Sequence, residues 1–350
     1  MRVAVKRDQT VISEDGRIVG HDAGATLVRR FLRIFPGAQV IGPSARRCHG
    51  FDVVPLEFLD PENTVIINMD VLDSPTIWNT IYQASGGTAP KIMNFVWWPV
   101  SFLERPEQKY TAALSCAMFP TFAASERTAS EVKELVHKST LPQLEGKMKL
   151  EWVNLGFRVD HVQERQETAK PIVLYPAIYL APVKRPDLFK EIVERVRKQV
   201  PIEVEMRLQE SSLISEKAMQ FSQLPWVWVG PLTSTRSSYY EALSRTTAFL
   251  ATATDESYGM SYVEALGSGV IGILPDEEWA RALVPVDYPF FYRDKATAEK
   301  MLLEAVTAPE ECRKEIDRAA GGSFIDWIAR HHSDAAFDRE ITETVKEWFG

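Results

Sequence analysis

Two carboxylates frame one short segment of the chain. Residues 255–269 read DESYGMSYVEALGSG, in which Glu256 and Glu264 stand eight positions apart with Gly259 between them. Such a pair could act as an acid and a base on one bond. It could also accept hydrogen bonds from the hydroxyl groups of a ligand, or carry solvated charges on a helix. The spacing alone leaves these three interpretations open, so the elements that position the segment must decide between them.

The neighbouring residues place this segment at the end of a buried strand. The apolar run Thr247–Ala251 predicts a strand directly before it, and the apolar residues of Tyr262–Leu266 predict a helix that the segment opens. In open parallel sheets, ligands bind beyond the carboxyl ends of the strands. This position favours a binding role over a solvated helix face.

Apolar stretches and amphipathic stretches alternate along the whole chain. The predicted strands are Arg2–Val5, Ala38–Ile41, Thr64–Asn68, Lys91–Val96, Ala117–Phe119, Lys149–Val153, Ile172–Tyr175, Ile202–Met206, Trp226–Val229, Thr247–Ala251 and Val270–Leu274. The predicted helices are Ala25–Phe35, Ser125–Lys138, Pro186–Gln199, Ser237–Arg245, Tyr262–Leu266 and Phe337–Phe349. Strands that alternate with helices form parallel sheets with right-handed crossovers. Because the pattern restarts near residue 172, we expect an α/β protein with two doubly wound, Rossmann-like domains.

A polar, charged segment, Arg158–Lys170, separates the two halves of this pattern. The predicted regions are a first domain at 1–160, a linker at 161–170, a second domain at 171–330, and a terminal helix within 331–350 that crosses back to the first domain. His331 and His332 lie in a polar run, so we expect both at the surface.

Composition and charge favour a cytoplasmic protein. The 350 residues are 45% hydrophobic with a formal net charge of −8, and no apolar run approaches the roughly 20 residues that span a bilayer. The first residues lack the apolar core of a signal peptide. Cys48, Cys116 and Cys312 are scattered and have no disulfide or metal-ligand spacing. Residues 1–160 carry 18 basic and 18 acidic residues, so the net negative charge lies in the remainder.

The segment resembles the E-x7-E motif of the retaining, GT4-like glycosyltransferases with the GT-B fold. The matching residues are Glu256, Tyr258, Gly259, Glu264, Ala265 and Gly269. The resemblance implies two Rossmann-like domains whose parallel sheets face each other across a cleft. It also implies that the first domain lies on the acceptor side and the second on the nucleotide-sugar donor side.

Four other stretches resemble the family in the same order along the chain. They are Gly20–Gly24 as a glycine loop near the donor diphosphate, Ala124–Arg127 before a helix, Val153–Phe157 at the end of the first domain, and Tyr239–Leu243 in the helix two elements before the motif. Two positions depart from the family pattern. Tyr179 stands where the family has an arginine, for which Arg185 is the candidate substitute, and Val96–Pro99 lacks the family's histidine.

The resemblance assigns different roles to the two carboxylates. It implies that Glu264 accepts the ribose hydroxyls, and that Glu256 meets the sugar and acts in catalysis together with Lys184 on the diphosphate. The implied donor-binding residues are Gly24, Arg185, Tyr258, Gly259, Met260, Ser261 and Glu264. A glycine at position 24 would let backbone approach the phosphates, and the helix start at Met260 would present N–H groups to them.

The function implied by the resemblance is retaining transfer of a hexose to a hydroxyl group. The donor would be a UDP- or GDP-linked sugar, no cofactor or metal would take part, and attack would come from the front face without a covalent nucleophile. Asp70 and Asp73 are therefore not interpreted as metal ligands. A glycan, a lipid-linked sugar or a small molecule is the favoured acceptor, and a modified nucleic-acid base is the alternative.

Two other classes of protein stay open at this point. One is a non-catalytic GT-B-like protein that binds a sugar nucleotide or a partner, because the family's arginine and histidine are missing. The other is a dinucleotide-dependent enzyme, against which the lack of a GxGxxG sequence after the first strand argues.

Overall fold

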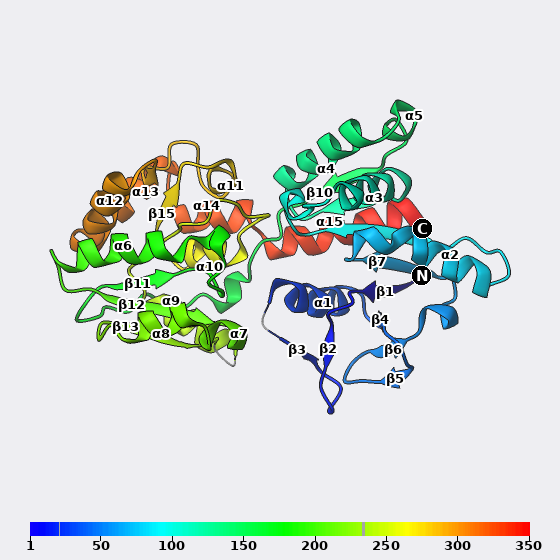
Figure 1. Cartoon of the computed structure of the whole chain (residues 1–350), viewed down its shortest axis with the longest axis horizontal. Helices are drawn as coiled ribbons and strands as arrows, with labels where there is room; N and C mark the ends of the chain where they lie inside the picture. Colours follow the sequence, from blue (N-terminus) through cyan, green and yellow to red (C-terminus); the bar gives the residue numbers. More distant parts are fainter. Residues whose placement is uncertain (21, 233–234) are drawn as a thin grey trace. The chain divides into compact units, whose positions relative to one another are not determined.

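The computed structural model describes residues 1–20, 22–232 and 235–350. His21, part of the predicted glycine loop, lies outside the described residues. The chain divides into two compact units, each shown with its sheet and helices in Figure 1. Unit 1 comprises Met1–Asn154 and Ala335–Gly350, and unit 2 comprises Leu155–Asp334.

Unit 1 is built on a sheet of eight strands in the order β10-β9-β8-β7-β1-β4-β6-β5. Every pair in this sheet is parallel except the pair of β5 with β6. The strands are β1 (Arg2–Lys6), β4 (Gln39–Ile41), β5 (Arg46–Arg47), β6 (Asp52–Val54), β7 (Thr64–Asn68), β8 (Lys91–Val96), β9 (Thr121–Ala123) and β10 (Leu150–Trp152), with a separate hairpin of β2 (Val11–Ile12) and β3 (Ile18–Val19). The central strand β7 is buried at all five positions, as expected for a parallel strand covered on both faces.

The helices of unit 1 include three that the sequence pattern predicted and three that it did not. They are α1 (Ala23–Ile34), α2 (Ser74–Ala84), α3 (Pro106–Met118), α4 (Glu126–Ser139), α5 (Pro142–Glu145) and the terminal α15 (Asp334–Phe349). The predicted strand at Ala117–Phe119 is wrong, because Ala117 and Met118 form the last turn of α3. This helix was missed because Tyr110, Leu114 and Met118 are exposed, which disguises its apolar face.

The terminal helix α15 belongs to unit 1, although it follows unit 2 in the chain. Phe337 is fully buried, and its ring centroid lies 6.1–6.4 Å from those of Phe31, Phe95 and Phe122. Asp338 accepts ion pairs from Arg30 at 3.0 Å and Arg33 at 2.8 Å, both on α1. These two arginines of α1 therefore hold the terminal helix by ion pairs.

Unit 2 is built on a fully parallel sheet of six strands in the order β13-β12-β11-β14-β15-β16. The strands are β11 (Ile172–Tyr175), β12 (Glu203–Leu208), β13 (Val227–Pro231), β14 (Ala248–Leu250), β15 (Ile271–Pro275) and β16 (Phe291–Tyr292). The helices are α6 (Pro186–Arg197), α7 (Glu210–Leu213), α8 (Glu216–Ser222), α9 (Arg236–Arg245), α10 (Met260–Gly267), α11 (Glu278–Arg281), α12 (Lys295–Thr307), α13 (Pro309–Ala319) and α14 (Phe324–His331). In Figure 1, α6 lies on one side of β11 and β12, and α9 lies on the other. The prediction of two doubly wound units with parallel sheets is confirmed.

The segment predicted as a linker is packed into unit 2, which begins at Leu155. Within it, the Arg165 guanidinium donates to the carbonyl oxygens of Leu243 at 2.9 Å and Ser268 at 3.4 Å, and also to that of Thr246. These carbonyls lie at the ends of α9 and α10, where helical carbonyls have no partner within the helix. The charged side chain of Arg165 therefore caps two helices of unit 2.

Among the described residues, no helix is both long enough and apolar enough to cross a membrane.

Candidate functional site

A buried ion pair lies beyond the carboxyl ends of two neighbouring strands of unit 2. Lys184 follows β11 and Glu256 follows β14, and these strands pair in the sheet. The Lys184 Nζ donates to Glu256 Oε1, and the two side chains are 5% and 15% exposed. The Lys184 Nζ also lies 5.3 Å from the centroid of the Tyr179 ring. Tyr179, the residue in the family's arginine position, thus contacts the predicted catalytic lysine.

The two loops that carry this pair are bonded to each other. The Thr252 hydroxyl donates to the carbonyl oxygen of Lys184 at 2.7 Å, and the Thr254 amide donates to that of Val183 at 2.9 Å. Both loops are therefore fixed relative to the sheet edge. Lys184 and Glu256 keep their positions by backbone contacts as well as by their own ion pair.

Two tyrosines, Tyr175 and Tyr262, lie close enough to the Glu256 carboxylate for its charge to act on their hydroxyl groups. Burial, followed by the nearby charge of Glu256, raises the pKa of Tyr262 well above its usual value. Burial, with further contributions from Tyr179 and Glu256, also raises the pKa of Tyr175. The Tyr262 hydroxyl therefore keeps a proton that it can donate to this carboxylate, whereas the Tyr175 hydroxyl donates to the carbonyl oxygen of Tyr179 at 3.2 Å.

Arg185 follows Lys184 in an unusual backbone conformation. It has φ 48° and ψ 53°, and among the described residues it is the one non-glycine residue with a positive φ. Such conformations cost about 1–3 kcal/mol and persist where surrounding structure imposes them. The bend turns the chain into α6 at Pro186 and leaves the Arg185 side chain exposed.

The helix α10 begins at Met260, directly after Gly259. Gly259 has φ 82°, and its carbonyl oxygen accepts from the amides of Tyr262 at 3.0 Å and Val263 at 3.1 Å. The amides of Met260 and Ser261 lie in the first turn, where a helix offers no internal acceptor. They are therefore suited to bind an anionic group.

We predict that Gly259→Ala destabilises the protein by about 2–5 kcal/mol. The left-handed backbone costs an alanine about 1–2 kcal/mol, and its Cβ would lie 2.8 Å from Cδ2 of Tyr262, an overpacking that costs about 1–3 kcal/mol. Urea unfolding would measure the loss. Gly321→Ala is the matched control, because Gly321 has φ 68° and nothing within 4 Å of its Cβ position. Equal losses in the two variants would contradict the expected contact with Tyr262.

The second carboxylate of the motif, Glu264, is buried within α10 and paired with a residue from another helix. Its side chain is 6% exposed, and Oε1 accepts from Nη2 of Arg236, the first residue of α9. Burial raises the pKa of Glu264, whereas the charge and hydrogen bond of Arg236 lower it. The net shift is upward, so burial has the larger effect on this carboxylate.

Tyr258 is directed into unit 2 by a chain of hydrogen bonds. Its hydroxyl oxygen accepts from the Gly156 amide at 2.9 Å and lies 2.8 Å from Nδ1 of His332. The Nε2 of His332 lies 3.0 Å from the carbonyl oxygen of Leu283, so Nε2 carries the proton and Nδ1 accepts from the Tyr258 hydroxyl. These bonds fix the Tyr258 side chain inside the unit, which favours a structural role over the predicted contact with a donor.

His332 is 1% exposed, so the expectation that it lies at the surface is wrong. The sequence pattern failed here because the polar neighbours of His332 conceal a side chain that two internal hydrogen bonds satisfy. His331 is exposed, as expected.

We predict that acid destabilises unit 2 through His332. Burial lowers the pKa of His332 from 6.5 to about 4. The unfolded chain therefore binds a proton below pH 6.5 that the native protein does not, so stability falls as the pH falls toward 4. A shift of about 2.5 units corresponds to roughly 3 kcal/mol. Between pH 7 and pH 4, the free energy of unfolding measured with urea should fall more steeply with pH for the wild type than for His332→Gln. The control His331→Gln should show the same pH dependence as the wild type.

Gly24 belongs to unit 1, where an arginine covers it. A Cβ at Gly24 would lie 2.3 Å from Nε of Arg7, a side chain that is 7% exposed. The Arg7 guanidinium donates to Asp22 at 2.8 Å and lies 5.8 Å from the Trp97 ring centroid. The Arg7 side chain thus fills the space beside Gly24, the position at which the resemblance implies an approach of backbone to the donor phosphates.

A cluster of opposite charges surrounds Lys6, the last residue of β1 in unit 1. The Lys6 Nζ lies 2.8 Å from Asp8, 3.1 Å from Asp70 and 2.7 Å from Asp73. Burial opposes the charge of Lys6, but the three carboxylates prevail and raise its pKa to about 12. The ammonium group of Lys6 therefore occupies the space between these acids.

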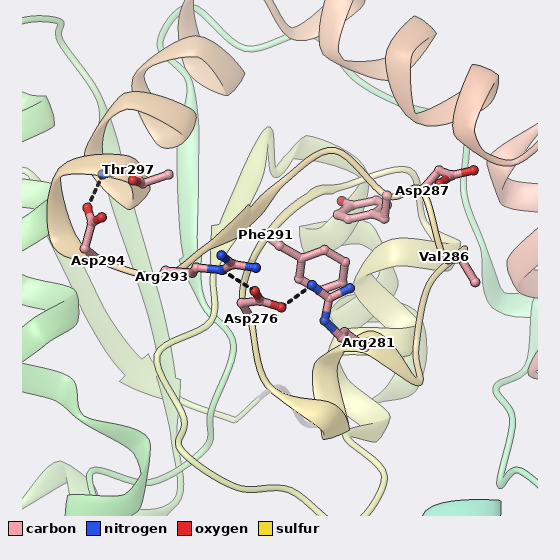
Figure 2. A pocket seen from close by; sticks show the side chains of 9 residues that line it. Asp276, Arg281, Val286, Asp287, Phe291, Arg293, Asp294 and Thr297 are labelled. Carbon is pink, nitrogen blue, oxygen red and sulfur yellow. Dashed lines mark hydrogen bonds and ion pairs between the residues drawn. The ribbon is translucent and has the colours of Figure 1, made fainter.

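A separate hollow of about 430 Å³ opens where β15 and β16 end. Figure 2 shows Asp276 at its centre, paired with Arg281 on one side and with Arg293 on the other. The bond with Arg293 holds the pKa of Asp276 below its usual value. None of the residues predicted for donor binding lines this hollow, and its charges largely compensate each other.

Arg236 is the residue of the site that sequence reasoning missed. It stands one residue before the predicted helix Ser237–Arg245, in the connection that follows β13. A search for charged residues after every predicted strand would have included it. Its pairing with Glu264 could not be read from the chain, because 28 positions separate the two residues.

Comparisons with known proteins agree on the fold. The sequence matches no protein-family model and no curated protein. Similar solved structures include the sucrose-phosphate synthase of Thermosynechococcus elongatus (TM-score 0.71, 9% identity, 99% of each chain) and HepE of Anabaena, solved with UDP and glucose (TM-score 0.69, 12% identity, 99% of this chain and 100% of HepE). TarM is also similar (TM-score 0.62, 14% identity). The match covers 83% of this chain but only 56% of the length of TarM.

These similar structures are GT-B glycosyltransferases. At identities of 9–14% they establish architecture and no more. The chain has the GT-B fold.

Proposed function

We propose that this protein transfers a sugar from a nucleotide-sugar donor to a hydroxyl group of an acceptor. The observation that carries the proposal is the arrangement at the edge of the unit 2 sheet. There Glu256, the start of α10 and the buried Glu264 follow one another within a single strand–loop–helix unit, and Lys184, from the loop after β11, pairs with Glu256. Each group matches one part of a nucleotide sugar.

The diphosphate is the most demanding part of the donor, because its charge increases as the bond to the sugar breaks. Lys184 supplies a full positive charge, and the amides of Met260 and Ser261 supply oriented donors at a helix start. In a site that is shielded from water, such groups stabilise developing negative charge far more than they would in water. Arg185 lies next to Lys184 and is exposed, so it is the second candidate cation for the diphosphate.

The remaining two contacts involve the carboxylates. Glu256, held beside Lys184, would accept hydrogen bonds from hydroxyl groups of the sugar, and Glu264 would accept those of the ribose. We propose the finer features on the resemblance of this segment to the E-x7-E motif. They are a hexose donor, retention of configuration, front-face attack, and a reaction that needs no metal ion.

The similar structures support a uridine donor. HepE was solved with UDP and glucose, and TarM was solved with UDP and α-GlcNAc-glycerol. We therefore propose UDP as the nucleotide, with GDP as the alternative. The acceptor is proposed to be a glycan, a lipid-linked sugar or a small molecule.

A thermal-shift screen against UDP-, GDP-, ADP- and TDP-sugars tests this function. A donor present at 100 times its dissociation constant should stabilise the folded protein by about 2.7 kcal/mol. A UDP-sugar should raise the melting temperature most. If none of the four classes changes the melting temperature at millimolar concentration, the proposed function is wrong.

One observation favours a second candidate, a GT-B protein that binds sugar nucleotides without catalysis. Tyr179 contacts Lys184 where the family has a second cation, so less positive charge is available to the leaving diphosphate. Release of UDP from UDP-glucose, with and without acceptors, separates the two candidates. Stabilisation by a donor without turnover would support the binding protein.

A further inference from the structure

The Glu264 carboxylate is paired with a cation of α9 whose guanidinium group lies against two aromatic rings of the same helix. Arg236 bonds to Glu264 Oε1, and its guanidinium carbon lies 5.2 Å from the Tyr239 ring centroid and 5.4 Å from that of Tyr240. Tyr240 is fully buried, whereas the Arg236 side chain is 43% exposed. A cation at the protein surface therefore reaches inward to a buried carboxylate.

We propose that Arg236 is a positioning residue for the donor: it keeps the Glu264 carboxylate charged and oriented to accept the ribose hydroxyls. This inference rests on the proposed function, because it concerns the residue assigned to the ribose. It adds a role for a side chain that lies outside the E-x7-E segment.

The surroundings of Glu264 explain why its charge needs support. Burial raises its pKa, and the nearby Asp334 raises it further. Burial, followed by the charge of Glu264, also raises the pKa of both Tyr239 and Tyr240, so these phenols are neutral. Arg236 is thus the group that opposes protonation of the carboxylate. A protonated Glu264 would lose the charge that strengthens hydrogen bonds from hydroxyl groups.

The ion pair with Arg236 does not use every acceptor position of the Glu264 carboxylate. The Arg236 Nη2 contacts one oxygen of the carboxylate, Oε1, whereas an ionised carboxylate offers about four lone-pair positions. The remaining positions can accept two ribose hydroxyls while the ion pair persists. Arg236 therefore need not leave when a donor binds.

Calorimetric titration with UDP-glucose between pH 5.5 and 8.5 tests the proposal. The diphosphate of this probe stays fully ionised over that range. The wild type and the control Arg245→Ala, an exposed residue of the same helix, should bind with similar affinity across the upper part of the range. Arg236→Ala should bind at least about 10-fold more weakly at pH 6.5 and recover as the pH rises. Arg236→Lys, which keeps the charge, should stay within a few-fold of the wild type.

Two outcomes would overturn the proposal while leaving the proposed function intact. In the first, Arg236→Ala binds UDP-glucose with the same affinity as Arg245→Ala at every pH. In the second, Arg236→Ala binds UDP-glucose more tightly than the wild type, which would mean that Arg236 blocks the ribose site. If the wild type binds no nucleotide sugar, the proposed function itself fails, and this inference fails with it.

A second measurement needs no ligand. In Arg236→Ala, the native carboxyl should hold its proton to a higher pH than the unfolded chain does. The test compares the free energy of unfolding of Arg236→Ala with that of the double variant Arg236→Ala/Glu264→Gln, which has no titrating carboxyl at position 264. The stability of Arg236→Ala should fall relative to that of the double variant as the pH rises from 5.5 to 8.5. A constant difference between these two variants over that range would show that Arg236 does not control the charge of Glu264.

Discussion

Lys184→Met should lower kcat for sugar transfer about 100- to 1,000-fold, the range observed when one preorganised donor is removed from a developing charge. The methionine keeps an unbranched side chain that is one atom shorter, and it removes the charge. Lys184 is 5% exposed and bonded to Glu256, so no solvent molecule can readily supply the missing charge in its place. A coupled assay of UDP release, at saturating donor, would measure the loss.

Stability must be separated from chemistry in this variant. Breaking a buried ion pair leaves Glu256 uncompensated, at a cost of about 3–5 kcal/mol. The double variant Lys184→Met/Glu256→Gln removes the unpaired charge, so it should regain much of the stability and none of the activity. The control Lys198→Met, at an exposed position directly after α6, should have the stability and the activity of the wild type. Wild-type turnover in Lys184→Met would disprove the assignment of this lysine to the diphosphate.

Glu264→Gln should weaken donor binding by about 10- to 100-fold, because hydrogen bonds to a charged group contribute about 1.5–3 kcal/mol each. Glutamine fits the same space and still accepts from Arg236 through its carbonyl oxygen. The effect should therefore appear in the dissociation constant for the donor more than in the folding free energy.

A deoxyribose probe makes this prediction specific to the ribose. The wild type should prefer UDP over 2′-deoxy-UDP, and Glu264→Gln should lose most of that preference. Glu241→Gln, an exposed acid on α9, is the control and should keep it. If Glu264→Gln weakens both nucleotides equally and retains the preference, Glu264 contacts some other part of the donor.

Much of the fold could be predicted because buried parallel strands have a strong local signal. The strands at Thr64–Asn68, Lys91–Val96 and Ile172–Tyr175 have the same bounds in the sequence pattern and in the structure. Each is a continuous run of mostly apolar residues, as expected when helices cover both faces of a sheet. The start of α4 also has a local signal, because the Ser125 side chain accepts a hydrogen bond from the Thr128 amide, only three residues later.

Prediction failed where the local signal and the tertiary environment disagree. The outward face of α3 carries Tyr110, Leu114 and Met118, so its apolar residues do not mark one buried side. His332 sits in a polar run, yet hydrogen bonds from Tyr258 and to Leu283 compensate its burial. In both cases the sequence shows the residue types but not the neighbours that determine their exposure.

The candidate site shows the same division between local and tertiary information. The sequence by itself determined the E-x7-E segment and its place after a strand, because these features depend on residues within a few positions of one another. Only the tertiary structure decided that Glu256 pairs with Lys184, 72 positions away, and Glu264 with Arg236, 28 positions away. A buried carboxylate needs a cation, but which cation it receives depends on how the sheet brings distant loops together.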